Sequence, residues 1–244
     1  MTAPAPCAIG VMAKAPQAGR SKTRLCPPLA PDEAAALSAA FLRDTTENLA
    51  EAARRAPIAA YAAYAPQGTE DLLRAGLAPG TGLVLADGSA PMPEGVQGFG
   101  RCLLHALDAL LAPGHPAACL LSSDCPTLPT DILVEAARLL LAPGDRAVLG
   151  ACADGGYYLL GLKARHAALF TGIAWSTDTV AEATRARARG IGLPLVELPP
   201  WYDVDDAASL ARLCAERDGY AAPATRGVLA RLGGTAQAAP RLTA

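Results

Sequence analysis

Short apolar runs alternate along the sequence with longer alanine-rich stretches that repeat apolar residues at helical spacing. Apolar runs of about four to eight residues are typical of buried strands, whereas helical periodicity over about ten or more residues indicates an amphipathic helix. The predicted strands are 7–13, 57–64, 82–87, 117–126, 146–152, 156–162 and 194–199. The predicted helices are 31–55, a short one in "DLLRAGL", 100–112, 129–141, 176–190 and 203–219.

The order of these elements predicts an α/β fold, in which a mostly parallel sheet is covered by helices on both faces. The turn residues 154–156 stand between two apolar runs, so a hairpin is the default expectation there. No linker of biased composition divides the chain before residue 222. We therefore expect one domain over 1–222, followed at 223–244 by a loosely ordered tail rich in Ala, Pro and Gly.

Composition restricts the function further. The 244 residues are 52% hydrophobic and carry a formal net charge of −2, which argues against a protein that binds nucleic-acid polymers. No apolar run reaches the ~20 residues of a membrane-spanning helix, and the N-terminus lacks the pattern of a secretion signal. The seven cysteines include no C-x-x-C pair, which is typical of reduced thiols. We expect a cytoplasmic protein with no membrane partner.

Four cations nevertheless gather directly after the first predicted strand, in "AKAPQAGRSKTRL" (13–25). In parallel α/β sheets, ligands bind beyond the carboxyl ends of the strands, and backbone N–H groups with Lys and Arg side chains suit phosphate oxygens. A solvated basic surface is the alternative. The residues predicted to bind phosphate are Lys14, Ala15, Pro16, Gly19, Arg20, Lys22 and Arg24.

Two acidic segments also fall where predicted elements meet. Asp124 in "SSDCP" ends the most apolar strand, where its carboxylate could bind Mg²⁺, although a plain turn aspartate is the alternative. Asp203, Asp205 and Asp206 precede the last predicted helix. Helix capping explains one of these three aspartates, and a cation would ease the crowding of the others. Either Asp203 or Asp205 is therefore a candidate second metal ligand.

Six segments together resemble the DUF2064 family, also called rSAM/selenodomain-associated transferase 1. They are "KAPQAGRSKTRL", "QGFGRCLLHAL", "SSDCPTLP", "ADGGYYLLGL", "WSTDTV" and "WYDVDDAASL", and they extend over nearly the whole chain, from residue 14 to residue 210. The resemblance implies a three-layer α/β/α sandwich with a Rossmann-like fold, of the nucleotide-diphospho-sugar transferase (GT-A) superfamily. The "SKTRL" motif is also similar to the loop of the phospholactate guanylyltransferases of coenzyme F420 biosynthesis.

The same resemblance implies roles for individual residues. Asp124 and Asp205 would hold Mg²⁺ or Mn²⁺, and Lys22 and Arg24 would lie at the triphosphate. The sequence departs from the family relatives in two places: Ala-Pro-Gln-Ala-Gly replaces the glycine-rich loop of many nucleotidyltransferases, and "SSDCP" lacks the D-x-D of many glycosyltransferases.

These observations lead to one main hypothesis. A Mg²⁺-dependent nucleotidyltransferase would couple a nucleoside triphosphate to a phosphorylated small molecule, with Lys22, Arg24 and Asp124 as catalytic residues. The four cations favour it, since a triphosphate carries roughly four negative charges. One alternative is a glycosyltransferase that uses a nucleotide sugar, and another is a nucleotide-binding protein without turnover. A homodimer is a candidate assembly.

The acceptor is expected to bind between the loop at 88–100 and the segment "GGYYLL". Packing and a plain hairpin are the alternative explanations for these segments. The residues predicted to bind the acceptor are Gln97, Gly98, Arg101, Asp154, Gly155, Gly156, Tyr157, Trp175 and Ser176.

Overall fold

The computed structural model describes residues 5–238. The strands are β1 (Cys7–Lys14), β2 (Ile58–Ala65), β3 (Gly82–Leu85), β4 (Ala118–Ser122), β5 (Ala147–Ala151), β6 (Tyr157–Leu162) and β7 (Leu195–Glu197). The α-helices are α1 (Pro31–Ala53), α2 (Glu70–Arg74), α3 (Phe99–Leu111), α4 (Thr130–Leu141), α5 (Val180–Gly190), α6 (Ala207–Ala215) and α7 (Pro223–Ala238). Two short 3-10 helices are η1 (Thr23–Leu25) and η2 (Ala167–Phe170).

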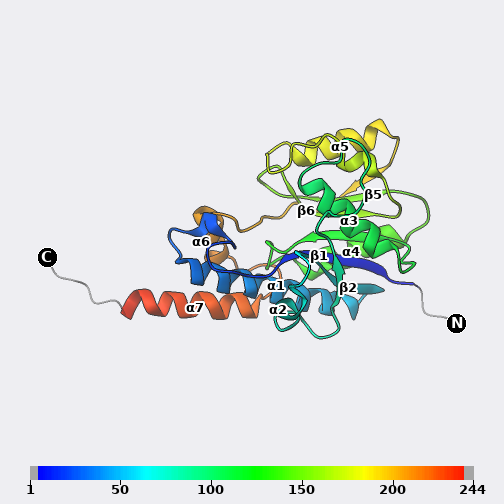
Figure 1. Ribbon diagram of the computed structural model, residues 1–244. Coiled ribbons are helices and arrows are strands. Elements are labelled where there is room, and N and C mark those ends of the chain that lie inside the picture. The colour runs from blue at the N-terminus through cyan, green and yellow to red at the C-terminus, as the bar shows by residue number, and fades with distance from the viewer. Residues whose placement is uncertain (1–4, 239–244) are drawn as a thin grey trace.

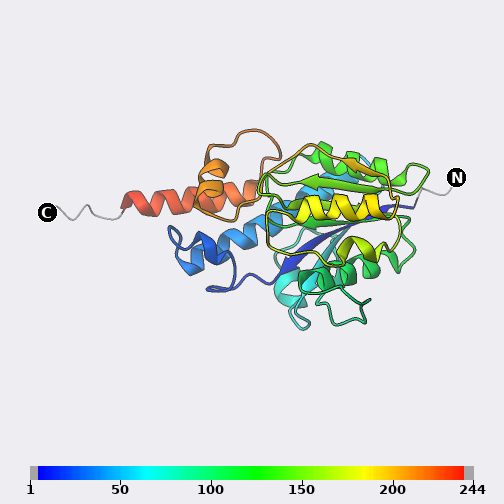
Figure 2. The ribbon, with the colours of Figure 1, turned by 90° about the horizontal axis from the view of Figure 1, so that it is seen from above.

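The seven strands form one sheet in the order β3-β2-β1-β4-β6-β5-β7. β6 runs antiparallel to both of its neighbours, and the other pairs are parallel. One apolar core joins the sheet to α1 and α4, and another joins its opposite face to α3, η2 and α5 (Figures 1 and 2). The predicted three-layer sandwich with a mostly parallel sheet is therefore confirmed, as is the hairpin between β5 and β6.

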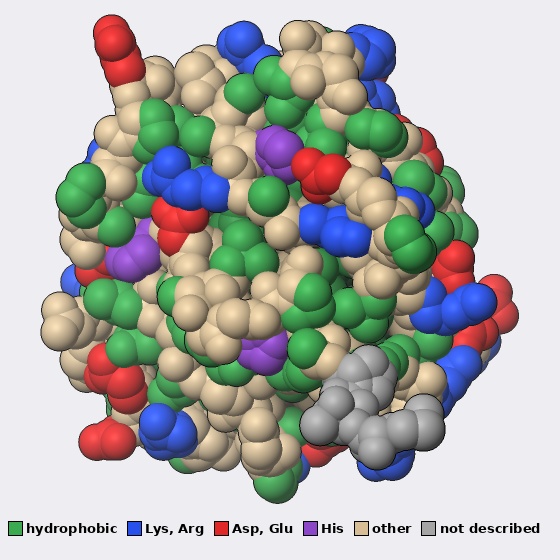
Figure 3. Space-filling model, turned by 90° about the vertical axis from the view of Figure 1, so that its right-hand side faces the viewer, with side chains coloured by type: hydrophobic (Ala, Val, Ile, Leu, Met, Phe, Trp, Pro, Cys, Tyr) green, Lys and Arg blue, Asp and Glu red, His purple; other side chains and the backbone are tan. Residues whose placement is uncertain are grey.

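This topology creates a switch point at one end of the sheet. The chain leaves β1 toward β2 on one side, while β4 lies on the other side of β1. Such a switch point is where open α/β sheets bind ligands. Because β6 is antiparallel, its first residue, Tyr157, lies at the same edge as the carboxyl ends of β1 and β4. At the opposite end, where the N-terminus emerges, acidic and basic side chains are interspersed (Figure 3).

A third apolar cluster lies beyond the sheet, between the first half of α1 and the helices η1, α6 and α7 (Figure 1). Leu25 of η1 and Val204, just before α6, are both fully buried in it. Burial of two such side chains contributes roughly 1.5–3 kcal/mol each. This packing holds the loop after β1 against the segment after β7, although the two are far apart in the sequence.

Two local expectations differ from the structure. Pro223–Ala238, expected to be part of a loosely ordered tail, form α7. The buried carboxylate of Asp44 accepts hydrogen bonds from the first backbone N–H groups of this helix, and Val228 packs into the third cluster. Residues 239–244 of the predicted tail lie outside the described residues, and the domain limit at 222 stays a prediction.

The helix predicted to start at residue 176 begins instead at Val180, with Thr179 at its N-cap position. Ser176 has a positive φ of 64° and lies in the turn before it, a conformation that cannot continue into a right-handed helix. None of the helices within residues 5–238 combines the length and apolar character that crossing a membrane requires.

Candidate functional site

A cavity of about 470 Å³ opens at the edge of the sheet where β1 and β4 end. The loop after β1 forms one wall, α3 another, and the residues after β4 with the start of β6 form the floor. Its polar lining includes Lys14, Arg20, Ser21, Lys22, Thr23, Arg24, Ser122, Ser123, Asp124 and Asp205. The cationic loop and Asp124 therefore face one cavity, as the sequence predicts.

Lys22 lies at the centre of the polar groups. Its Nζ is 2.6 Å from Asp124 Oδ1 and 2.8 Å from Asp205 Oδ1, and it donates a hydrogen bond to the carbonyl oxygen of Val204 at 2.8 Å. The Lys22 side chain is only 7% exposed. Burial alone would lower the pKa of Lys22, but the charges of Asp124 and Asp205 outweigh it, so the pKa lies above its ordinary value. Lys22 is therefore a buried, charged ammonium.

The chain segments around Asp124 explain how the acidic residues converge. The backbone N–H of Val204 donates to the carbonyl oxygen of Asp124, and Trp201 exchanges backbone hydrogen bonds with residues 151 and 153. The segment after β7 thus runs past the end of β5 and then past the end of β4. Asp206 accepts a hydrogen bond from the backbone N–H of Ser209 and caps α6, so capping uses one aspartate of the three.

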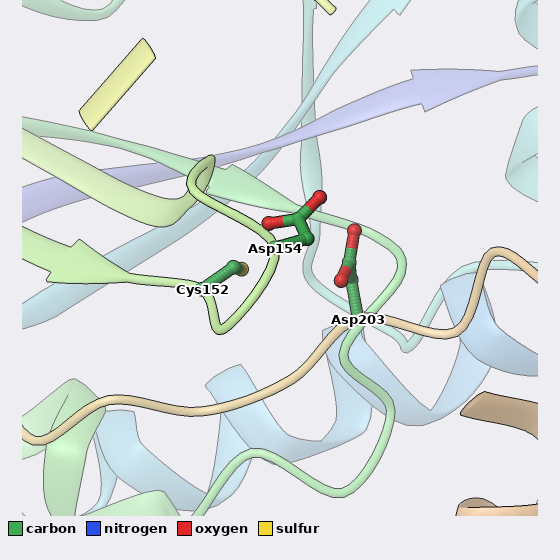
Figure 4. Close-up of side chains that lie close together, drawn as sticks. All are labelled: Cys152, Asp154 and Asp203. Carbon is green, nitrogen blue, oxygen red and sulfur yellow. The ribbon is translucent and has the colours of Figure 1, made fainter. Parts of the chain in front are cut away.

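Asp203 belongs to a second group of ligand atoms beside Asp124. Sγ of Cys152 and carboxylate oxygens of Asp154 and Asp203 all lie within 4.8 Å of one another. Figure 4 shows the turn between β5 and β6 bringing Cys152 and Asp154 next to Asp203, which comes from the segment after β7. Burial, together with the charges of Asp154 and Asp205, raises the pKa of Asp203 to about 6. These carboxylates are crowded without a cation of their own.

This donor set fits a divalent cation. Asp154 and Asp203 offer carboxylate oxygens within 4.8 Å of each other, Asp124 and Asp205 line the cavity, and hard cations such as Mg²⁺ and Mn²⁺ prefer oxygen ligands. A thiol at Cys152 would favour a softer ion of this group, Mn²⁺ over Mg²⁺. Within residues 5–238, Asp205 forms ion pairs with both Lys22 and Arg24, whereas Asp203 forms none, so either aspartate stays a candidate metal ligand beside Asp124.

The remaining predicted phosphate-binding residues divide into two sets. Lys14, Arg20 and Arg24 line the cavity, and Arg24 is 74% exposed while its guanidinium contacts Asp205 Oδ2 at 2.7 Å. Ala15, Pro16 and Gly19, all within the described residues, lie outside the cavity lining. Gly19 has a positive φ of 71°, which turns the loop and is a conformation that glycine adopts without strain.

Of the nine residues predicted to bind the acceptor, all of them described, Tyr157 alone lines the cavity. Its buried hydroxyl has no hydrogen-bond partner within residues 5–238. Arg101 instead donates to the carbonyl oxygens of Gly88 and Ala90 and fixes the loop after β3. Gln97 is exposed, and its neighbour Gly98 is the N-cap residue of α3.

Trp175 packs on the first turn of α3, where it meets the ring of Phe99 edge-on. Gly100 provides the room, since a Cβ there would lie 2.8 Å from Trp175 Nε1. The turn Asp154–Gly156 packs instead against the start of α5, where the carbonyl oxygen of Gly155 accepts from the backbone N–H of Ala181. Trp175, Ser176 and the turn Asp154–Gly156 lie outside the cavity lining.

Sequence reasoning missed Phe99, Cys102 and Leu103, which form the α3 wall, and Ser38 and Leu42 of α1. Nothing in their local sequence distinguishes them from core positions of an amphipathic helix. Cys152 was also missed as a possible ligand, and its position directly before "ADGG" was the available signal.

The family model described as "Uncharacterized protein conserved in bacteria (DUF2064)" matches residues 48–177, more than half of the sequence. The chain belongs to the DUF2064 family. The resemblance inferred from the six segments is confirmed. No curated protein is similar enough to the sequence to count as a match.

Solved structures confirm the fold of this DUF2064 protein. A protein from Desulfovibrio desulfuricans G20, described provisionally as a nucleotide-diphospho-sugar transferase, is 25% identical with a TM-score of 0.79, over 95% of this chain and 96% of that one. CMP:2-keto-3-deoxy-manno-octonic acid synthetase in complex with CTP is 12% identical with a TM-score of 0.52, over 86% and 97%. Glucosyl-3-phosphoglycerate synthase of Mycobacterium tuberculosis, with Mn²⁺ and UDP, is 12% identical with a TM-score of 0.50, over 93% and 78%.

Proposed function

We propose that this chain is a metal-dependent nucleotidyltransferase, which joins a nucleoside triphosphate to a phosphorylated small molecule and releases pyrophosphate. Its solved structural relatives are transferases of the GT-A type, which supports the general class of this reaction. Nucleotidyl transfer in particular is supported by one observation. Four cations line the cavity that Asp124 also lines: Lys14, Arg20, Lys22 and Arg24.

The size and charge of the cavity suit such a substrate. A volume of about 470 Å³ lies within the roughly 300–1,000 Å³ of small-molecule sites. A triphosphate carries roughly four negative charges near neutral pH, which four basic side chains would balance. A nucleotide sugar carries a diphosphate and needs fewer cations.

The proposed reaction forms one bond and breaks one. An oxygen of the acceptor phosphate attacks the α-phosphorus of the triphosphate, the bond from that phosphorus to the α–β bridging oxygen breaks, and pyrophosphate leaves with the electron pair. Lys14, Arg20, Lys22 and Arg24 hold the β- and γ-phosphates and stabilise the charge on the leaving group. Such a reaction needs little covalent participation by the protein, because alignment and charge neutralisation supply most of the acceleration.

Asp124, with Asp203 or Asp205, would hold the divalent cation. The cation, when bound, neutralises charge on the phosphate that reacts. Tyr157 supplies a buried hydroxyl with no partner within residues 5–238, at the end of the cavity where β6 begins. We assign this hydroxyl to the acceptor side, because the proposed phosphate-binding cations all come from the end of β1 and the loop after it.

Glycosyl transfer from a nucleotide sugar is the second candidate. The relative with the TM-score of 0.79 is described as a nucleotide-diphospho-sugar transferase, and Lys22, one of the four cations, is already engaged by protein oxygens. In that reaction the anomeric carbon of the sugar would be attacked and a nucleoside diphosphate would leave.

The products distinguish the two reactions. The purified protein is incubated with each nucleoside triphosphate or with nucleotide sugars, in Mg²⁺ or Mn²⁺, and with pooled phosphorylated and hydroxylated small molecules. Pyrophosphate that appears only with an acceptor supports nucleotidyl transfer, whereas nucleoside diphosphate released from a nucleotide sugar supports glycosyl transfer. If neither product forms, and if nucleotide binds tightly both to the wild type and to Asp124→Ala, the protein is instead a nucleotide-binding protein without turnover.

The Asp124→Asn variant tests the site itself. It should lower kcat/KM by at least about 100-fold, because a charged group acting on the reacting phosphate is lost. The matched control is Asp71→Asn, which removes an exposed carboxylate on α2 outside the cavity. Equal activity of the Asp124→Asn variant and the control would remove Asp124 from the reaction.

A further inference from the structure

The ammonium group of Lys22 has all of its hydrogen-bond donors engaged by the protein. An ammonium carries three N–H donors, and Nζ of Lys22 has three oxygen partners. These are Asp124 Oδ1 at 2.6 Å, Asp205 Oδ1 at 2.8 Å and the carbonyl oxygen of Val204 at 2.8 Å. In this arrangement Lys22 has no donor left for a phosphate oxygen.

The same contacts engage the two carboxylates. Nζ lies within 2.8 Å of one oxygen of Asp124 and one of Asp205, so it holds the position that a cation bridging both aspartates would take. An ammonium and a divalent cation repel each other and compete for these oxygens. Lys22 as a phosphate ligand and Lys22 as the partner of the aspartates are therefore two alternative arrangements.

The charges in this group balance as the structure stands. Asp124 and Asp205 contribute two negative charges, and Lys22 and Arg24 contribute two positive ones. A free divalent cation at the two aspartates would add two positive charges and leave the mostly buried Lys22 without an anionic partner. Leaving a buried charge unpaired is costly. A divalent cation that arrives on a polyphosphate brings the replacement anion with it.

We propose that this site takes the divalent cation and the polyphosphate as one preformed complex, and that Lys22 exchanges partners when the complex binds. The ammonium of Lys22 passes from Asp124 and Asp205 to the phosphates, and the cation takes its place between the aspartates. The proposal rests on the proposed function only in the class of ligand, a nucleoside polyphosphate. Lys22 thereby excludes free metal from the bridging position.

The position of Lys22 allows this exchange. Its backbone lies outside the regular elements, at the N-cap of η1 with a φ of 50°, and the preceding residues 17–20 are exposed. Arg24 is mostly exposed and keeps its contact with Asp205 Oδ2, so Asp205 retains one cation during the exchange. The Lys22 side chain moves while the buried Leu25 and Val204 hold the two segments together.

Metal binding measured without turnover tests the proposal. Mn²⁺ binding to the full chain is followed by electron paramagnetic resonance, with and without a non-hydrolysable nucleoside triphosphate analogue. Nucleotide should tighten Mn²⁺ binding to the wild type by at least about tenfold, and Mn²⁺ should tighten nucleotide binding by the same factor, since such coupling is reciprocal. Independent binding of the two would overturn the proposal.

Two variants separate the role of Lys22 from a general effect of charge. Lys22→Met should bind Mn²⁺ alone at least about tenfold more tightly than the wild type and lose most of the coupling. Lys163→Met, which removes a lysine that donates to the carbonyl oxygen of Ala142, should behave like the wild type. If the wild type and Lys22→Met bind Mn²⁺ with equal affinity, the proposed exchange of partners by Lys22 is overturned. This result would follow if Asp154 and Asp203 alone bound the ion.

If Lys22→Met does not fold, the coupling between Mn²⁺ and nucleotide binding in the wild type still tests the proposal. These readouts are also independent of the proposed reaction. Strong coupling between Mn²⁺ and nucleotide binding, without pyrophosphate formation, would reject the nucleotidyltransferase and support the exchange by Lys22. Pyrophosphate formation without this coupling would support the nucleotidyltransferase and reject the exchange.

Discussion

Replacement of Asp203 by Asn should stabilise the metal-free protein near neutral pH and have little effect near pH 4. Burial and the charges of Asp154 and Asp205 raise the pKa of Asp203 from 3.8 to about 6. The folded protein therefore binds a proton at Asp203 more tightly than the unfolded chain does. Stability that depends on this proton is present at low pH and is lost as the pH rises from about 4 through about 6.

The magnitude follows from that difference in pKa. About two pH units correspond to about 3 kcal/mol, at about 1.4 kcal/mol per unit. Asp203 is only partly buried, so solvent screening reduces the expected effect to about 1–2 kcal/mol. Asn keeps the size of the side chain and removes the charge. The variant should therefore exceed the wild type by about 1–2 kcal/mol at pH 7.5.

Urea denaturation followed by circular dichroism, at several values between pH 4 and pH 8 in the presence of a chelator, measures this difference. Asp71→Asn serves as the control, because its exposed carboxylate should give no gain at any pH. Mn²⁺ added together with a non-hydrolysable nucleoside triphosphate analogue should stabilise the wild type more than Asp203→Asn if Asp203 is one of the metal ligands, because a ligand that binds only the folded state stabilises it. A gain that is the same at pH 4 and pH 7.5, or a loss at pH 7.5, would refute the reasoning.

Three further outcomes are expected. Asp44→Ala should lower the free energy of unfolding by about 1–3 kcal/mol in urea, because buried N–H groups at the start of α7 lose their acceptor; an unchanged value would show that the carboxylate is dispensable. Gly155→Ala should lower Tm, since its Cβ would lie 1.9 Å from the carbonyl oxygen of Asp178 at a residue with positive φ, and an unaltered melting curve contradicts this close packing. Arg24→Gln should weaken binding of a triphosphate about tenfold in calorimetry, whereas Arg165→Gln, outside the cavity, should not.

The sheet and its helices could be predicted from the sequence because each strand is a short apolar run and each main helix has its own apolar face. The exceptions depend on distant contacts. Pro223–Ala238 has only three large apolar residues, and the start of the helix there is held by Asp44, 180 positions before Ala224. Local pattern also could not show that the turn at Ser176 has left-handed backbone, which delays the start of α5.

The site illustrates a different limit. Strand direction alone places the loop after β1 and Asp124 at one edge of the sheet, so their meeting could be predicted. Their direct pairing could not, because it depends on Leu25 and Val204 packing into one cluster and carrying Lys22 and Asp205 with them. From the sequence, Lys22 appears as a phosphate ligand and the aspartates as metal ligands. A buried ammonium needs an anionic partner with or without phosphate, and in this structure the aspartates supply it. The groups that are proposed to hold a cation and an anion can therefore neutralise each other when neither ligand is bound, which is why local sequence alone does not reveal their pairing.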